Sequence, residues 1–160
     1  MTLSPMPPRP PRLQVLGRVA GLSVYLVSGE QVRNTLDIDF TQGGNEAIYP
    51  TYVPRGEIWL DDAIRTFDRM ATTLHELVER DLMLHHGLGY DRAHDRASAQ
   101  ERVFRRDLAR DRPREFDARR VSGAYRAYLR DTRRPARQLE REIGAALGRR
   151  STGRSARRVA

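Results

Sequence analysis

The spacing of hydrophobic and polar positions changes at residue 62. Before it, short apolar runs alternate with turn residues, and the clearest runs are LQVLGRVA, LSVYLV and EIWLD. Runs of this length, bounded by glycine, proline, asparagine and aspartate, are typical of β-strands. Because the connections between them are short, the pattern predicts a small antiparallel sheet over residues 13–62.

Three weaker segments of the same region are expected to complete this sheet. EQVRNT follows the turn signal Ser28-Gly29 and is predicted to be a hairpin partner of LSVYLV. LDIDF leads into a turn cluster at residues 41–45. AIYPTYV contains Pro50, which restricts it to an edge strand or a bulged strand.

After Asp62 the apolar positions follow the period of an α-helix. One stripe recurs at i, i+3, i+4 and i+8: Leu74, Leu77, Val78 and Leu82. Asp62 is a candidate N-cap for this helix, and Gly87 and Gly89 are expected to end it. A second helix is predicted to begin near Asp91, another candidate N-cap, and to stop at Pro113.

The predicted fold class is therefore α+β, with a small antiparallel sheet followed by a helix that carries the sequence HELVE and by a helical C-terminal section. Two shorter helices are expected at about 117–130 and 135–147. The expected organisation is a disordered proline-rich leader (1–12), an α+β domain (13–112), an arginine-rich helical extension (113–148) and a disordered basic tail (149–160).

Composition limits the chemistry that the chain can carry. It has 160 residues and no cysteine, so disulfides and thiolate metal sites are excluded, and a metal ion would need histidine and carboxylate ligands. No apolar run approaches the roughly 18 residues that span a membrane. We therefore expect a cytoplasmic protein without a membrane partner.

Charge is distributed unevenly along the chain. Residues 1–100 contain 10 Arg and 13 acidic residues, a net charge of −3, whereas residues 101–160 contain 19 Arg and 8 acidic residues, a net charge of +11. Such a basic half is able to contact nucleic acid non-specifically through phosphates. The interleaved acidic residues favour a solvated, internally paired surface instead, and both interpretations stay open.

All four histidines fall within residues 75–94, and the first opens the sequence HELVE. In a helix, His75 and Glu79 lie on one face at i and i+4, so both can reach one metal ion about 2.0–2.2 Å away. Glu76 is rotated by about 100° from His75 and cannot be a third ligand on that face. It has the position of the general base in an H-E-x-x-H helix.

A third ligand has to come from elsewhere in the chain. His86 lies 11 residues beyond His75, which is about 16 Å of helical rise, and His85 is similarly distant. His94 follows the expected helix–helix turn and can return toward Glu79. The alternative to a metal site is an i,i+4 pair of His75 and Glu79 on a helix surface.

Three segments, EIWLDD, TTLHELVERDLM and GLGYDRAH, resemble the compact zincin-type metallopeptidases encoded in bacteria and their phages. The resemblance covers about residues 47–100. It implies a zinc ion held by His75 and the downstream ligand His94, with Glu76 as general base. Glu79 stands where the family usually has histidine, and a carboxylate there is a permissible ligand.

This resemblance implies a zinc-dependent peptidase acting on a peptide or protein substrate, with the strand EIWLD pairing to the substrate backbone. Two other functions remain open. One is an arginine-rich accessory protein of a phage or mobile element that binds nucleic acid or a protein through residues 101–160. The other is a catalytically silent zincin-like scaffold.

Overall fold

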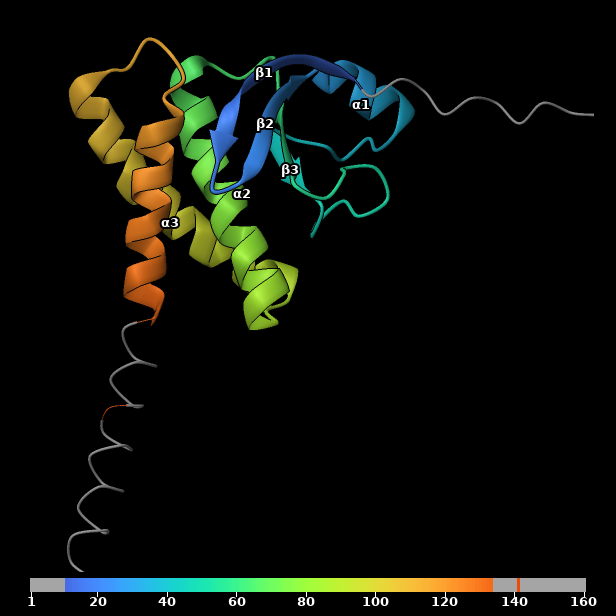
Figure 1. The fold of residues 1–160 in the computed structure, drawn as a ribbon. Coiled ribbons are helices and arrows are strands. Elements are labelled where there is room, and N and C mark those ends of the chain that lie inside the picture. Colours follow the sequence, from blue (N-terminus) through green and yellow to red (C-terminus); the bar gives the residue numbers. More distant parts are fainter. Residues whose placement is uncertain (1–10, 134–140, 142–160) are drawn as a thin grey trace, which may run out of the picture. The chain divides into compact units, whose positions relative to one another are not determined.

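A mixed four-stranded sheet forms the first half of the structure, a computed structural model that describes residues 11–133 and 141 (Figure 1). Its order is β1 (Arg12–Val19), β2 (Leu22–Val27), β4 (Glu57–Asp61) and β3 (Gly43–Asn45). Helices follow the sheet, so the predicted α+β class is confirmed.

The prediction that the sheet is antiparallel throughout is wrong, because β2 and β4 are parallel. Their pairing runs from Ser23 opposite Glu57 to Val27 opposite Asp61, while the β1–β2 and β3–β4 pairs are antiparallel. β4 therefore lies inside the sheet and has neighbours on both sides. It cannot pair with a substrate backbone, and the edge strand of the described sheet on that side is β3.

The segment predicted as a hairpin partner is a short helix, α1 (Gly29–Thr35). The Ser28 side chain accepts a hydrogen bond from the backbone N–H of Gln31 at 3.2 Å and caps this helix. Val32, inside α1, is fully buried against Trp59 of β4. Burial of this one apolar position holds the segment as a helix on the sheet.

The segments LDIDF and AIYPTYV, predicted as strands, form turns in the structure. They supply side chains to the same apolar cluster as α1, on the face of the sheet that carries Trp59: Phe40, Tyr49, Tyr52 and Val53. The Tyr49 and Tyr52 rings stack with centroids 5.0 Å apart. Side-chain packing thus overrides the strand-like pattern of these residues.

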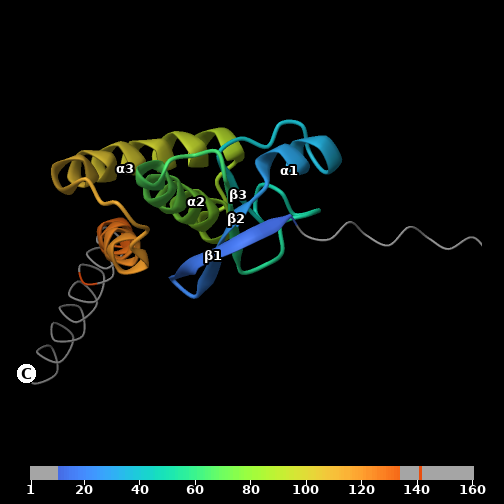
Figure 2. The ribbon, with the colours of Figure 1, turned by 90° about the horizontal axis from the view of Figure 1, so that it is seen from above.

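On the other side of the sheet, α2 (Thr66–His86) contacts β3 and β4, and α3 (Tyr90–Asp111) returns along α2 (Figure 2). The predicted end of α2 is confirmed, because Gly87 adopts the left-handed conformation at φ 64°. Neither predicted N-cap is correct. The cap positions are Arg65 and Gly89, and Asp62 instead accepts a hydrogen bond from the backbone N–H of Gly29.

A further helix covers residues 118–133. The chain divides into two compact units, residues 1–125 and 126–160, and the sheet, α2 and α3 all belong to the first. The predicted leader covers residues 1–12, and this boundary is wrong, because Arg12 is the first residue of β1 and pairs with Glu57. Residues 1–10, the helix predicted at 135–147 apart from residue 141, and the tail at 149–160 lie outside the described residues. Within the described part, no helix is long and apolar enough to span a membrane.

Candidate metal centre

The three polar residues of the sequence HELVE in α2 are buried where a surface helix would expose them. His75, Glu76 and Glu79 are 7%, 5% and 1% exposed. Burying ionisable groups is costly unless they are paired or bind a metal. The sequence HELVE is therefore not a solvated ion pair on a helix surface.

α3 brings His94 to the same place. His94 Nδ1 lies 3.1 Å from Glu79 Oε1 and 3.2 Å from His75 Nε2, and His75 Nε2 lies 3.8 Å from Glu79 Oε1. The structure thus brings together the three residues selected from the sequence as ligands. We call His75, Glu79 and His94 the three-residue cluster.

The spacing of these donor atoms fits a tetrahedral metal ion. Ligands that each lie about 2.0–2.2 Å from zinc are separated by roughly 3.3–3.6 Å in a tetrahedron. The three separations of 3.1, 3.2 and 3.8 Å lie around that range. Two imidazoles and one carboxylate are also a ligand set that zinc uses in catalytic sites.

Glu101 of α3 orients His75, and sequence reasoning missed it. Its Oε2 lies 2.9 Å from His75 Nδ1, so Nδ1 carries the proton and Nε2 faces Glu79 and His94. Arg105 donates to Glu101 Oε1 from Nε at 2.8 Å and also pairs with Asp68. A signal was available, because residues 94, 101 and 105 share one face of α3.

The pKa of His75 is raised to about 10. Burial, the largest effect, works against this rise, but the hydrogen bond to Glu101 and the nearby carboxylates of Glu79 and Glu76 exceed it. In the absence of a metal, His75 is therefore an imidazolium whose protons point at Glu101 and at the cluster. A metal ion would take the place of the proton on Nε2.

Glu76 is held away from the three-residue cluster by Asn45, the last residue of β3. Asn45 Nδ2 donates to Glu76 Oε2 at 2.8 Å. Burial is the main cause that raises the pKa of Glu76 to about 8, and the charge of Glu79 adds to it. A carboxyl group that titrates near neutrality is suited to accept and return a proton.

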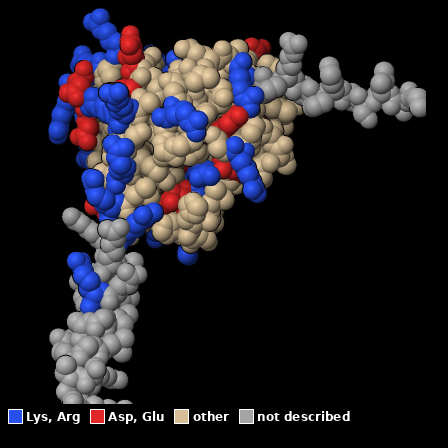
Figure 3. Space-filling view, in the orientation of Figure 1, with Lys and Arg blue, Asp and Glu red and all other residues tan. Residues whose placement is uncertain are grey.

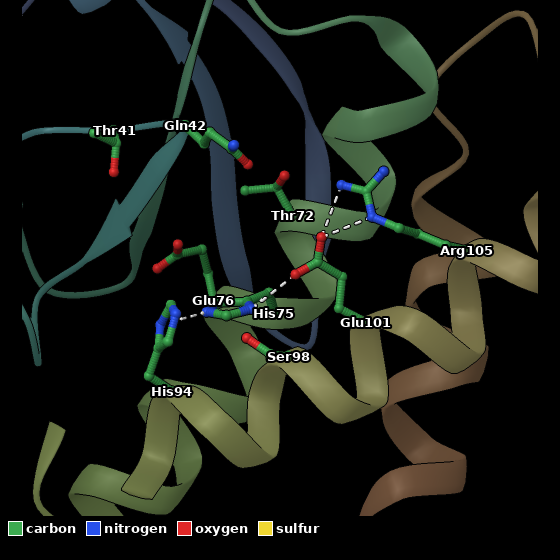
Figure 4. A pocket seen from close by; sticks show the side chains of 9 residues that line it. All are labelled: Thr41, Gln42, Thr72, His75, Glu76, His94, Ser98, Glu101 and Arg105. Carbon is green, nitrogen blue, oxygen red and sulfur yellow. Dashed lines mark hydrogen bonds and ion pairs between the residues drawn. The ribbon is translucent and has the colours of Figure 1, made fainter. Parts of the chain in front are cut away.

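Glu76, His75 and His94 line one cleft of about 430 Å³ (Figure 4). The other lining residues come from the turn that precedes β3, from α2 and from α3: Thr41, Gln42, Thr72, Ser98, Glu101 and Arg105. At Gly43 the backbone of β3 comes so close that an added Cβ would lie 2.9 Å from Thr72 Cγ2 and 3.2 Å from Glu76 Oε1. Glycine is thus required to close this wall of the cleft.

The other two histidines lie outside the cluster, as expected from helix geometry. His86 Nε2 is 3.3 Å from Asp81 Oδ2 in the last turn of α2. His85 is exposed on the same turn. Both stand in the last turn of α2, away from the three-residue cluster.

The described part of the arginine-rich half is a mixed surface. Figure 3 shows acidic and arginine side chains side by side where the C-terminal end of α3 lies. Arg120 pairs with Asp111 at 2.7 Å, and Arg110 lies 3.8 Å from Asp107. Pairs of this kind reduce the net field that would attract a polyanion. Contact with nucleic acid stays a prediction.

No protein family matches this chain, and comparisons with curated proteins and with solved structures find no match. Any functional assignment therefore has to stand on the geometry of the site.

Proposed function

We propose that this protein is a zinc-dependent hydrolase that cleaves peptide bonds, with the metal held by His75, Glu79 and His94. The single observation that carries the proposal is the convergence of three donor atoms, 3.1–3.8 Å apart, at the wall of a cleft. The side chain of His94 is 45% exposed, so the three-residue cluster lies within reach of solvent. The likeness of residues 47–100 to zincin-type peptidases points to the same chemistry.

Zinc at this position would supply a Lewis acid that polarises a substrate carbonyl and acidifies a water molecule. The chain's own contribution is made by Glu76. Asn45 fixes Oε2, and the other oxygen is left to take a proton from the attacking water and pass it to the leaving nitrogen. Glu101 holds His75 in the orientation that directs Nε2 to the metal.

A peptide as the substrate is inferred from the resemblance of residues 47–100 to zincin-type peptidases, not from an open sheet edge. β3 pairs with no second strand of the described chain, but its three residues, Gly43, Gly44 and Asn45, are all buried. Their burial leaves no exposed edge at which an extended peptide could add a strand. Because β3 ends at Asn45, which touches Glu76, the strand instead holds the proposed proton acceptor in place at the cleft.

A cleavage assay with the full chain tests this proposal. Wild-type protein should cleave a fluorogenic peptide library, lose the activity with a chelator and regain it with zinc. Glu76→Gln should retain zinc but cleave at least about 100-fold more slowly, because it cannot accept the proton.

Glu46→Gln is the matched control, since Glu46 is also a buried glutamate beside β3 but faces Arg80. It should keep wild-type cleavage. Cleavage that resists chelation, or that survives in Glu76→Gln at the wild-type rate, would contradict the proposal.

A further inference from the structure

A buried hydroxyl in the wall of the cleft lacks a partner. Thr72 is 4% exposed, and its Oγ1 has no hydrogen-bond partner among the described residues. Its neighbour Thr73 behaves in the usual way for a helix and donates to the Arg69 carbonyl four residues earlier at 2.7 Å. An unsatisfied buried hydroxyl destabilises the fold, so its position on a cleft points to a ligand that satisfies it.

A strained turn places a second polar group beside Thr72. Gln42 has a φ of 54°, which is unusual for a residue with a side chain. The N–H of Gly43 donates to the Thr41 carbonyl at 2.5 Å, so Gln42 is the centre of a three-residue turn of a rare, strained kind. The turn is held by Asp61, whose N–H donates to the Gln42 carbonyl at 2.8 Å.

Figure 4 shows the side-chain amide of Gln42, the hydroxyl of Thr72 and the guanidinium of Arg105 along the same end of the cleft, away from His94. Strain of this kind persists where the surrounding structure enforces it, commonly at ligand sites. The turn thus presents Gln42 to whatever occupies the cleft.

Charge at this end of the cleft selects a neutral ligand. The Arg105 guanidinium is matched by two carboxylates, those of Glu101 and Asp68. A carboxylate ligand would have to compete with both, and a cationic ligand would have to displace Arg105. Hydroxyl, carboxamide and guanidinium groups together offer donors and at least two acceptors. An amide group also has both a hydrogen-bond donor and an acceptor, and it carries no charge.

We propose that Thr72, Gln42 and Arg105 form a subsite that binds an amide group of the peptide substrate, either an Asn or Gln side chain or a backbone amide. This inference rests on the proposed function, because it assumes that the cleft receives a peptide. It adds the class of chemical group that the cleft prefers to bind next to the three-residue cluster.

The test measures binding to the full, zinc-depleted chain, so that cleavage plays no part. Labelled alanine-based octapeptides carry one Gln that is moved along the sequence, and a matched set carries Met in its place. A third set replaces one backbone amide at a time by an ester. The wild type should bind its best Gln peptide, or its best all-amide peptide, about 2- to 12-fold more tightly than the matched analogue.

Thr72→Val keeps the shape of the side chain and removes the hydroxyl. It should abolish this discrimination and should leave the thermal midpoint unchanged or higher, because an unpaired hydroxyl is lost. Thr73→Val is the control: it removes a hydroxyl that is already bonded within α2 and should keep the discrimination. Discrimination in the Gln set alone identifies a side-chain amide, and discrimination in the ester set alone identifies the backbone.

Equal binding in both comparisons by the wild type, or discrimination that survives in Thr72→Val, would overturn the subsite. These outcomes are separate from failure of the hydrolase proposal. Absence of zinc binding or cleavage would leave the measured preference for an amide intact.

Discussion

Two buried glutamates stand at the end of β3, and their surroundings push them in opposite directions. Glu46 and Glu76 are 9% and 5% exposed. Burial disfavours both charges, but hydrogen bonds and the charge of Arg80 lower the pKa of Glu46 despite it. Glu76 has the neutral amide of Asn45 as its partner and Glu79 nearby, so its pKa rises to about 8.

The two glutamates differ in the groups that surround and neutralise their negative charge. Arg80 of α2 donates twice to Glu46 Oε1, at 2.8 and 2.6 Å, so the charge of Glu46 is paired, while Glu46 Oε2 has no hydrogen-bond partner among the described residues. At the other site, three glutamates surround two histidines: Glu76, Glu79 and Glu101 around His75 and His94. A divalent cation would complete the second site, whereas the first site needs none.

Loss of a ligand should have the largest effect. His75→Ala removes a donor atom from the cluster and should weaken zinc binding by at least about 100-fold, since changes in the outer shell already cost roughly 10- to 100-fold. Competition with a chromophoric chelator measures this affinity. Arg80→Met should bind zinc as the wild type does, and an equal loss in both variants would remove the distinction between the two sites.

Breaking the Glu46–Arg80 pair should affect folding and spare the metal. Arg80→Met leaves Glu46 buried and unpaired, and we expect a loss of about 2–4 kcal/mol in the free energy of unfolding. Denaturant unfolding of the zinc-free chain measures it. The double variant with Glu46→Gln should recover most of the loss, and a double variant as unstable as the single one would show that Arg80 acts in another way.

Glu101→Gln should have a smaller effect than loss of His75. The amide can still accept from His75 Nδ1, but the negative charge that strengthens the ligand is lost. Zinc affinity should fall by about 10- to 100-fold in the same competition assay. Because Arg105 also pairs with Asp68, the fold should persist, and unchanged affinity would mean that the charge of Glu101 does not strengthen His75 as a ligand.

The pH dependence of stability should distinguish Glu76 from Glu46, and we expect this to be the smallest of the four effects. The raised pKa of Glu76 favours folding at low pH, and this contribution disappears as pH rises from 4.5 to about 8. His75 acts in the same direction between 6.5 and about 10. Glu46, whose pKa is lowered, stabilises at neutral pH and loses that contribution in acid.

Thermal unfolding of the zinc-free chain at pH 3–10 measures these contributions. Glu76→Gln should flatten the loss of stability on the alkaline side, and Glu46→Gln should flatten the loss on the acid side. Identical profiles for the two variants would contradict the assigned pKa shifts.

The local pattern of the sequence predicts much of this structure. Helical period identifies α2 and α3, Gly87 marks the end of α2, and i,i+4 spacing with a short turn selects His75, Glu79 and His94. These features depend on neighbours in the chain. Predictions based on them need no knowledge of the sheet.

The local pattern of the sequence does not predict which distant segments pair in the sheet. The sequence predicts α1 as a strand, because Ser28-Gly29 is a hairpin turn signal, although Ser28 and Gln31 also have the spacing of a helix cap. The parallel alignment of β2 and β4 joins residues that are 34 positions apart in the chain, such as Ser23 and Glu57. Asn45 became a partner of Glu76 only through the position of β3.

Native mass spectrometry of the untagged full chain, equilibrated with one equivalent of zinc, tests the central claim most directly. We expect one zinc ion per wild-type chain, and none on the His75→Ala and His94→Ala variants, whose folding is checked by circular dichroism. A folded wild-type chain that takes up no zinc, or variants that take up as much as the wild type, would contradict the account.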